Sequence, residues 1–241
     1  MKKTLFDYIV TVVIMLVSFP ILLFLGLITS VLLIIFPKKS HLSIFAFCAA
    51  TSVLFGIWIK YKGPFPKKGE YIFLFNHSSF IDYFLSVLAM GYKRKWVIVY
   101  GKNLEKYPIF KFFLRRIGIG VDRSSQKSKV EASDKIRKAL NDGFSLALFP
   151  EGTRMRSYQM AEILLPFKNG AFSNAIELGK DIIPTIFSRP ILYSRPDKPI
   201  PFSPRVITIT YGNPISVEGK SRVELRDETH FIMKKMLLNT P

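Results

Sequence analysis

The segment YIFLFNHSSFID, residues 71–82, places an apolar run directly before a cluster of polar residues. A short apolar run of this kind is typical of a strand that is buried on both faces of a parallel sheet. Helical spacing of apolar residues follows over residues 79–90, so the segment predicts a strand, a turn and a helix. In a parallel sheet the turn lies at the carboxyl end of the strand, where ligands bind.

The chain beyond residue 61 alternates between strand and helix patterns. Further strands are predicted over residues 96–100, 118–121, 144–149, 181–187 and 205–211. Helices are predicted over residues 104–117, 128–140, 169–179 and 218–239. Ser128 and Glu131 have the spacing of a capping box, which places a helix start at Ser128. The alternation predicts an α/β fold in which a largely parallel sheet is flanked by helices.

The first 60 residues differ from the rest because they carry only five basic residues and one acidic residue. Residues 8–36 have no charge, and this run exceeds the roughly 20 residues that cross a hydrocarbon core. A second apolar run, residues 42–59, is near the lower limit for crossing. We therefore predict a hydrophobic two-helix membrane anchor over residues 1–60 and an α/β domain over residues 61–241.

The N-terminal run is too long for the apolar region of a signal peptide, and no small-residue cleavage site follows it cleanly. Lysines flank every end of the two runs, so charge counting leaves two alternatives open: helices that span the bilayer and helices that dip into one leaflet. In both alternatives the two helices form a hairpin, which returns the chain to the side of the membrane where it began. We expect the basic domain on the cytoplasmic face of the membrane, near anionic headgroups.

The net charge of the chain is +18, with 35 basic against 17 acidic residues among 241. Such an excess implies a polyanionic partner, which can be nucleic acid, an anionic membrane surface or a phosphorylated substrate. Cys48 is the single cysteine, which excludes an internal disulfide and a cysteine-cluster metal site. The sequence has no P-loop, no complete G-x-G-x-x-G, no G-x-S-x-G and no H-E-x-x-H motif.

His77 and Asp82 follow the strand over residues 71–75 and are the first candidates for chemistry. A carboxylate that reaches one imidazole nitrogen fixes the tautomer, and the other nitrogen can then take a proton from an alcohol. The alternative is a histidine that caps a helix beside a solvated aspartate. The spacing of the pair does not by itself decide between the two.

A second polar cluster, FPEGTR at residues 149–154, follows another predicted strand and is expected at the same edge of the sheet. Glu151 offers an acceptor for a hydroxyl group, and Arg154 offers a guanidinium fork for phosphate. A surface turn with an ordinary ion pair is the alternative. Several basic residues lie between the two clusters, and Arg123, at the end of a third strand, is the best phosphate-binding candidate among them.

Four sequence blocks in order resemble the glycerolipid acyltransferase superfamily, specifically the lysophosphatidic acid (1-acylglycerol-3-phosphate) acyltransferases. NHSSFID at residues 76–82 is similar to the N-H-x-S-x-x-D block of that family. Residues 101–123 are similar to the second block, residues 149–154 to the third and residues 181–187 to the fourth. The match covers roughly residues 60 to 217, and the family also has an N-terminal two-helix membrane element.

The resemblance implies transfer of an acyl group from acyl-CoA or acyl-carrier protein to the sn-2 hydroxyl of lysophosphatidate, which forms phosphatidic acid. It implies no further cofactor and no metal, and a partner membrane of anionic phospholipid rather than nucleic acid. By position, His77 is the general base and Asp82 orients it. The resemblance also implies a set of substrate-binding residues: Glu151 and Gly152 at the glycerol part, Arg154 at the phosphate, and Thr153, Lys102 and Arg123 as further contacts.

Two alternatives remain beside this interpretation. Relatives of the family acylate other lysophospholipids or aminolipids, so the acceptor can differ while the catalytic residues stay the same. A non-catalytic basic module that binds membranes or nucleic acid also agrees with the net charge of +18. It gives no reason for His77, Asp82, Glu151 and Arg154 to occur where they do.

Overall fold

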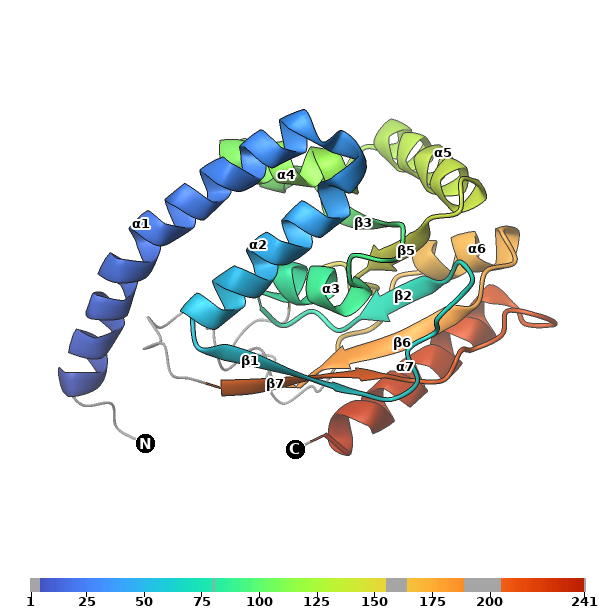
Figure 1. The fold of residues 1–241 in the computed structure, drawn as a ribbon. Helices are drawn as coiled ribbons and strands as arrows, with labels where there is room; N and C mark the ends of the chain where they lie inside the picture. Colours follow the sequence, from blue (N-terminus) through green and yellow to red (C-terminus); the bar gives the residue numbers. More distant parts are fainter. Residues whose placement is uncertain (1–4, 80, 155–163, 189–204, 241) are drawn as a thin grey trace.

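The computed structural model describes residues 5–79, 81–154, 164–188 and 205–240. They form a seven-stranded sheet covered by helices on both faces, with two N-terminal helices over one of these faces (Figure 1). The predicted α/β class is confirmed.

The sheet has the order β1-β7-β6-β2-β5-β3-β4. Neighbouring strands run parallel except β6 and β7, which are antiparallel, so β1 and β7 run opposite to the other five. The strands are β1 (Ile57–Lys62), β2 (Ile72–Phe75), β3 (Trp96–Gly101), β4 (Gly118–Val121), β5 (Ser145–Leu148), β6 (Ile182–Phe187) and β7 (Arg205–Tyr211).

The helices divide between the two faces of the sheet. They are α1 (Leu5–Ile35), α2 (Ser40–Leu54), α3 (Asp82–Met90), α4 (Pro108–Ile117), α5 (Gln126–Asn141), α6 (Gly170–Glu177) and α7 (Arg222–Leu238), with short 3-10 helices η1 (Pro37–Lys39) and η2 (Lys102–Lys106). One core lies under α2, α3 and α4, and the other lies under α5, α6 and α7. Strand β2 contributes Phe73 and Phe75 to the first core and Ile72 and Leu74 to the second. Burial on both faces explains its unbroken apolar sequence.

The N-terminal segment forms two helices, as predicted, but they differ in kind. Within α1, Leu16–Ile35 is long and apolar enough to cross a membrane by length and composition, and much of its apolar surface is exposed. Helix α2 has 15 residues, which is short for crossing. Its buried Ile44 and Cys48 belong to the core that α3 and α4 share. Helix α2 is therefore also part of the α/β domain.

The predicted helical run over residues 42–59 is wrong at its end. Helix α2 stops at Leu54, Gly56 has a φ of 65°, and Ile57–Lys62 is strand β1, paired in parallel with β7. The strand is rich in isoleucine and aromatic residues, and its last four residues alternate between apolar residues and lysine, which favours an edge strand over a helix. The predicted boundary between residues 60 and 61 consequently lies inside β1.

The start of α5 also differs from the prediction. Ser125, not Ser128, is its N-cap, and the Ser125 hydroxyl accepts from the backbone N–H of Ser128 at 3.2 Å. The Ser128 hydroxyl instead accepts from the backbone N–H of Asp122 at 3.0 Å. The capping box in the described residues is at α7, between Ser221 and Glu224.

Gly63, in the turn after β1, and Gly91, at the end of α3, should differ in how strongly an alanine substitution destabilises the fold. Gly63 and Gly91 both have positive φ, but a Cβ on Gly63 would lie 2.0 Å from the carbonyl oxygen of Tyr211, whereas one on Gly91 meets nothing within 4 Å. We expect Gly91→Ala to lower the free energy of unfolding by about 2 kcal/mol, because its backbone, at φ 69° and ψ −178°, lies in a region that only glycine adopts readily. Gly63→Ala should cost about 2 kcal/mol more, because the backbone must shift. Urea unfolding in detergent micelles measures both, and equal losses would contradict the close approach.

Candidate active site

The carboxyl ends of β2, β3, β4 and β5 meet at one edge of the sheet and enclose a cavity of about 210 Å³. The structure brings five of the predicted site residues to its lining: His77, Arg123, Gly152, Thr153 and Arg154. Tyr83 and Phe149 also line it. Sequence patterns alone had not singled out Tyr83, although it lies next to Asp82 on the first turn of α3.

The carboxylate of Asp82 is the centre of the hydrogen-bond network at this edge. Its Oδ2 lies 2.9 Å from Nδ1 of His77 and accepts from the backbone N–H groups of Ser78 and Ser79, each at 2.7 Å. Asp82 is fully buried, so the alternative of a solvated aspartate is excluded. Because a carboxylate oxygen accepts, Nδ1 of His77 carries the proton, and Nε2 is the nitrogen with a free lone pair.

Two aromatic rings fix the plane of the His77 imidazole. Phe149 stacks on it with ring centroids 4.3 Å apart, and Tyr83 meets it edge-on at 5.6 Å. Burial raises the pKa of Tyr83, while the charges of Arg123 and Arg154 act in the opposite direction. The imidazole thus lies between two rings, in a cavity whose other charged groups are cationic.

Glu151 acts on the backbone of the site. Its Oε1 accepts from the backbone N–H of His77 at 2.6 Å, and its Oε2 accepts from that of Leu165 at 3.1 Å. The side chain is buried, and burial raises its pKa to about 8, although the two N–H donors oppose this shift. Both oxygens thus have backbone donors, so Glu151 positions His77. Each carboxylate oxygen can accept a second hydrogen bond, so the contact of Glu151 with the glycerol part of a substrate stays a prediction.

Asn76 also positions backbone at this edge of the sheet, a role that no sequence motif indicated. Its Oδ1 accepts from the backbone N–H of Phe187 at 2.8 Å, and its Nδ2 donates to the Phe187 carbonyl at 3.2 Å. These bonds continue the pairing of β2 with β6 beyond the end of β2. The position of an asparagine directly after a buried strand was the available signal.

The predicted basic residues separate into two groups. Arg123 and Arg154 line the cavity, and the guanidinium of Arg123 lies 3.4 Å from where a Cβ on Gly152 would be. Lys102 is exposed on η2 and lies outside the cavity lining. Arg115 pairs with Glu105 at 2.7 Å, so it serves structure.

A second, apolar cavity of about 150 Å³ adjoins the first, because Tyr83 lines both. Its walls come from α2, α3, β3 and α4, and they include Phe47, Cys48, Val87 and Phe113. No polar side chain other than the Tyr83 hydroxyl and the Cys48 thiol belongs to its described lining. Helix α2 therefore joins the N-terminal segment to the site.

Comparisons with known proteins agree with this arrangement. A family model described as Acyltransferase matches residues 58–188. The chain is 28% identical over 149 residues to a 1-acyl-sn-glycerol-3-phosphate acyltransferase of Cocos nucifera, covering 61% of this chain and 46% of that one. It is 29% identical over 198 residues to the protein of the same name in Limnanthes douglasii, covering 78% and 65%. The chain thus spans about half to two-thirds of the length of these curated relatives.

The fold is also shared with a solved structure. The crystal structure of the 1-acyl-sn-glycerophosphate (LPA) acyltransferase PlsC from Thermotoga maritima superposes with a TM-score of 0.75 and 19% sequence identity. The superposition covers 96% of this chain and 95% of that one. It therefore includes the N-terminal helices as well as the sheet.

The buried Glu151 predicts a pH-dependent stability. Its pKa of about 8 in the folded chain exceeds the ordinary value of 4.5, so between these values the folded state holds a proton that the unfolded state loses. The stabilising contribution is full below pH 4.5 and is lost as the pH rises through 8. Glu151→Gln does not titrate, and its amide nitrogen faces an N–H donor, which costs about 1–3 kcal/mol.

We therefore expect the stability advantage of the wild type over Glu151→Gln to be largest near pH 5 and smaller at pH 8.5. Unfolding midpoints in detergent micelles at three pH values measure it. Glu131→Gln, at an exposed position of α5, is the matched control and should show no pH-dependent difference. A constant difference for Glu151→Gln across the range would contradict the raised pKa.

Proposed function

The chain belongs to the acyltransferase family, and from this premise we propose that it moves a fatty acyl group from an acyl thioester to the sn-2 hydroxyl of lysophosphatidate, forming phosphatidic acid. The observation that carries the proposal is the buried pair of His77 and Asp82, joined at 2.9 Å beside a cavity that Arg123 and Arg154 also line. The names of the curated relatives support lysophosphatidate as the acceptor.

His77 acts as the general base in this proposal. Its Nε2 takes the proton of the substrate hydroxyl while that oxygen attacks the thioester carbonyl, and the buried carboxylate of Asp82 stabilises the imidazolium that forms. The new C–O bond replaces the C–S bond, and the imidazolium returns its proton to the departing thiolate. The N–H groups of Ser78 and Ser79 already donate to Asp82, so stabilisation of the oxyanion falls to other donors at the cavity.

The two arginines bind the phosphate of the acceptor. Arg123 follows β4 and Arg154 follows β5, so the two guanidinium groups reach the same cavity from two strand ends that have β3 between them. Planar guanidinium forks match phosphate oxygens and bind them with charge-assisted hydrogen bonds. Thr153 and Gly152 complete this wall.

The apolar cavity beside Tyr83 receives the first part of an acyl chain. Its walls carry the aromatic and aliphatic side chains that such a chain requires, and α2 forms one of them. Helix α1 holds the enzyme at the membrane from which the lipid enters, with the α/β domain on the cytoplasmic face. Acyl-CoA or acyl-carrier protein is the co-substrate, and no other cofactor takes part.

Loss of the catalytic pair should abolish transfer without unfolding the protein. We expect His77→Ala and Asp82→Asn each to lower kcat at least about 100-fold, because each removes or disables the general base. Asparagine can keep its oxygen at the Oδ2 position, while its amide group takes the place of Oδ1, a buried atom with no hydrogen-bond partner among the described residues. The assay follows free thiol released from palmitoyl-CoA with lysophosphatidate in detergent micelles.

Asp134→Asn, at an exposed position of α5, is the control and should keep the wild-type rate. Substantial activity in purified His77→Ala would contradict the proposed base. Release with another lysophospholipid, but not with lysophosphatidate, would keep the mechanism and change the acceptor. Silence with palmitoyl-CoA and with acyl-carrier-protein thioesters would contradict the transferase.

The phosphate contact predicts a different kinetic pattern for Arg154. We expect Arg154→Ala to raise KM for lysophosphatidate about tenfold or more and to change kcat less, because a charge-assisted contact made in the ground state is lost. Arg222→Ala, at the exposed start of α7, is the matched control. An unchanged KM in Arg154→Ala would remove this residue from the phosphate site.

A further inference from the structure

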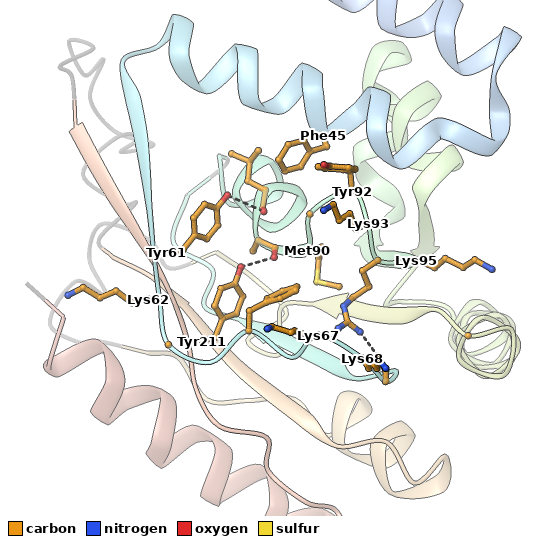
Figure 2. A pocket seen from close by; sticks show the side chains of 18 residues that line it. Phe45, Tyr61, Lys62, Lys67, Lys68, Met90, Tyr92, Lys93, Lys95 and Tyr211 are labelled. Atoms are coloured by element: carbon orange, nitrogen blue, oxygen red, sulfur yellow. Dashed lines mark hydrogen bonds between the residues drawn. The ribbon is translucent and has the colours of Figure 1, made fainter.

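Figure 2 shows the residues that line a larger cavity, of about 840 Å³. It lies at the edge of the sheet where β2, β3 and β5 begin, opposite the edge that holds His77. Its walls come from α2, the end of α3, the ends of β1 and β7, and the turns that precede β2 and β3. Helix α3 runs from Asp82 at the candidate active site to Met90 at this cavity. About 12 Å of helix axis therefore separates the two sites.

Cationic side chains from two chain segments gather around this cavity, which we call the basic cavity. The cationic residues of its lining are Lys62, Lys67, Lys68, Lys93, Arg94 and Lys95. In the described parts of the chain, no carboxylate lies within 4 Å of any of the five lysine ammonium groups. Glu70, the nearest acid in the sequence, pairs with Lys180 at 3.3 Å. Such a gathering of uncompensated charge attracts an anion.

The guanidinium of Arg94 is already hydrogen-bonded within the protein, so the lysines are the candidates for binding an anion. Its guanidinium donates to the backbone carbonyls of Pro66 and Gly69, and at 3.1 Å to the hydroxyl of Ser145. It also lies 5.5 Å from the ring centroid of Phe65. In Figure 2 the side chains of Lys67 and Lys93 lie over the cavity, whereas Lys62 and Lys95 extend away to either side.

Apolar side chains form much of the wall of the basic cavity. Phe45, Leu88 and Met90 contribute side chains, and the hydroxyls of Tyr61 and Tyr211 donate to the carbonyls of Leu88 at 3.3 Å and Ala89 at 2.7 Å. These bonds satisfy carbonyl groups at the C-terminus of α3, which would otherwise repel an anion. The cavity thus offers positive charge over an apolar wall.

We propose that the basic cavity binds the phosphate headgroup of an anionic phospholipid of the membrane that holds α1. Lysine ammonium groups bind the phosphate, and the aromatic and aliphatic walls take the glycerol and the first methylene groups. The exposed rings of Tyr61, Tyr92 and Phe65 lie at its rim, and aromatic residues of this kind are enriched where proteins meet the membrane interface. The proposal does not rest on the acyl-transfer reaction.

The test measures the unfolding midpoint of the full chain in maltoside micelles during titration with phosphatidylglycerol or phosphatidylcholine. A ligand that binds the folded state raises the midpoint, so phosphatidylglycerol should raise it and phosphatidylcholine should not. The variant Lys67→Gln/Lys68→Gln/Lys93→Gln should need at least tenfold more phosphatidylglycerol for half of the shift, because each lysine contributes about fivefold in affinity. The single variant Lys93→Gln should give an intermediate value.

The matched control is Lys127→Gln/Lys129→Gln/Lys135→Gln, which removes three exposed lysines of α5 and lowers the net charge equally. It should respond to phosphatidylglycerol like the wild type, and an equal loss in both triple variants would overturn the proposal in favour of net charge. His77→Ala and Arg154→Ala should also keep the response. Its loss in either would place the lipid in the active site instead.

A soluble arm distinguishes the source of the phosphate. Glycerol 3-phosphate and inorganic phosphate, at the same concentration as the lipid, should leave the midpoint unchanged, because they lack the apolar part that the walls bind. A shift equal to that of phosphatidylglycerol would overturn the lipid and assign the cavity to soluble phosphate esters.

Discussion

A single buried oxygen, Oδ2 of Asp82, organises the active-site edge of the molecule. It accepts from the His77 ring and from the backbone N–H groups of Ser78 and Ser79, at 2.7 to 2.9 Å. The same atom therefore closes the turn between β2 and α3 and selects the imidazole tautomer. The three hydrogen-bond donors around Asp82 offset the free-energy cost of burying its carboxylate. The orientation of the His77 ring and the local fold thus depend on the same carboxylate.

A second buried carboxylate, that of Glu151, joins two strand ends. It accepts hydrogen bonds from the backbone of His77, after β2, and from that of Leu165, beyond β5. The segments after β2 and β5 therefore cannot separate without breaking one of these bonds. Burial raises the pKa of Glu151, and the nearby charge of Asp82 adds to this shift. The guanidinium groups of Arg123 and Arg154 bring positive charge to the same region.

The sequence predicted the alternation of strands and helices and the residues that share the cavity, because strand ends in a parallel sheet converge whatever fills the loops. It could not predict β1, since an apolar run that ends a helix and begins an edge strand looks continuous. The N-cap at Ser125 was missed because Ser125 and Ser128 both have suitable side chains, and tertiary contact with Asp122 decides between them. Glu151 was placed in the site, but its backbone partner Leu165 is 14 residues away. No local pattern reports such a contact.

Helix α3 gives this architecture a functional consequence. Its first residue, Asp82, orients His77, the proposed base, while its last turn forms a wall of the basic cavity and is tied to β1 and β7 through Tyr61 and Tyr211. Helix α2 packs along it and continues into the membrane-directed helix α1. A lipid bound at the basic cavity would therefore contact the last turn of the helix whose first residue orients His77. The N-terminal helix α2 and the helix that orients His77 thus pack on the same core.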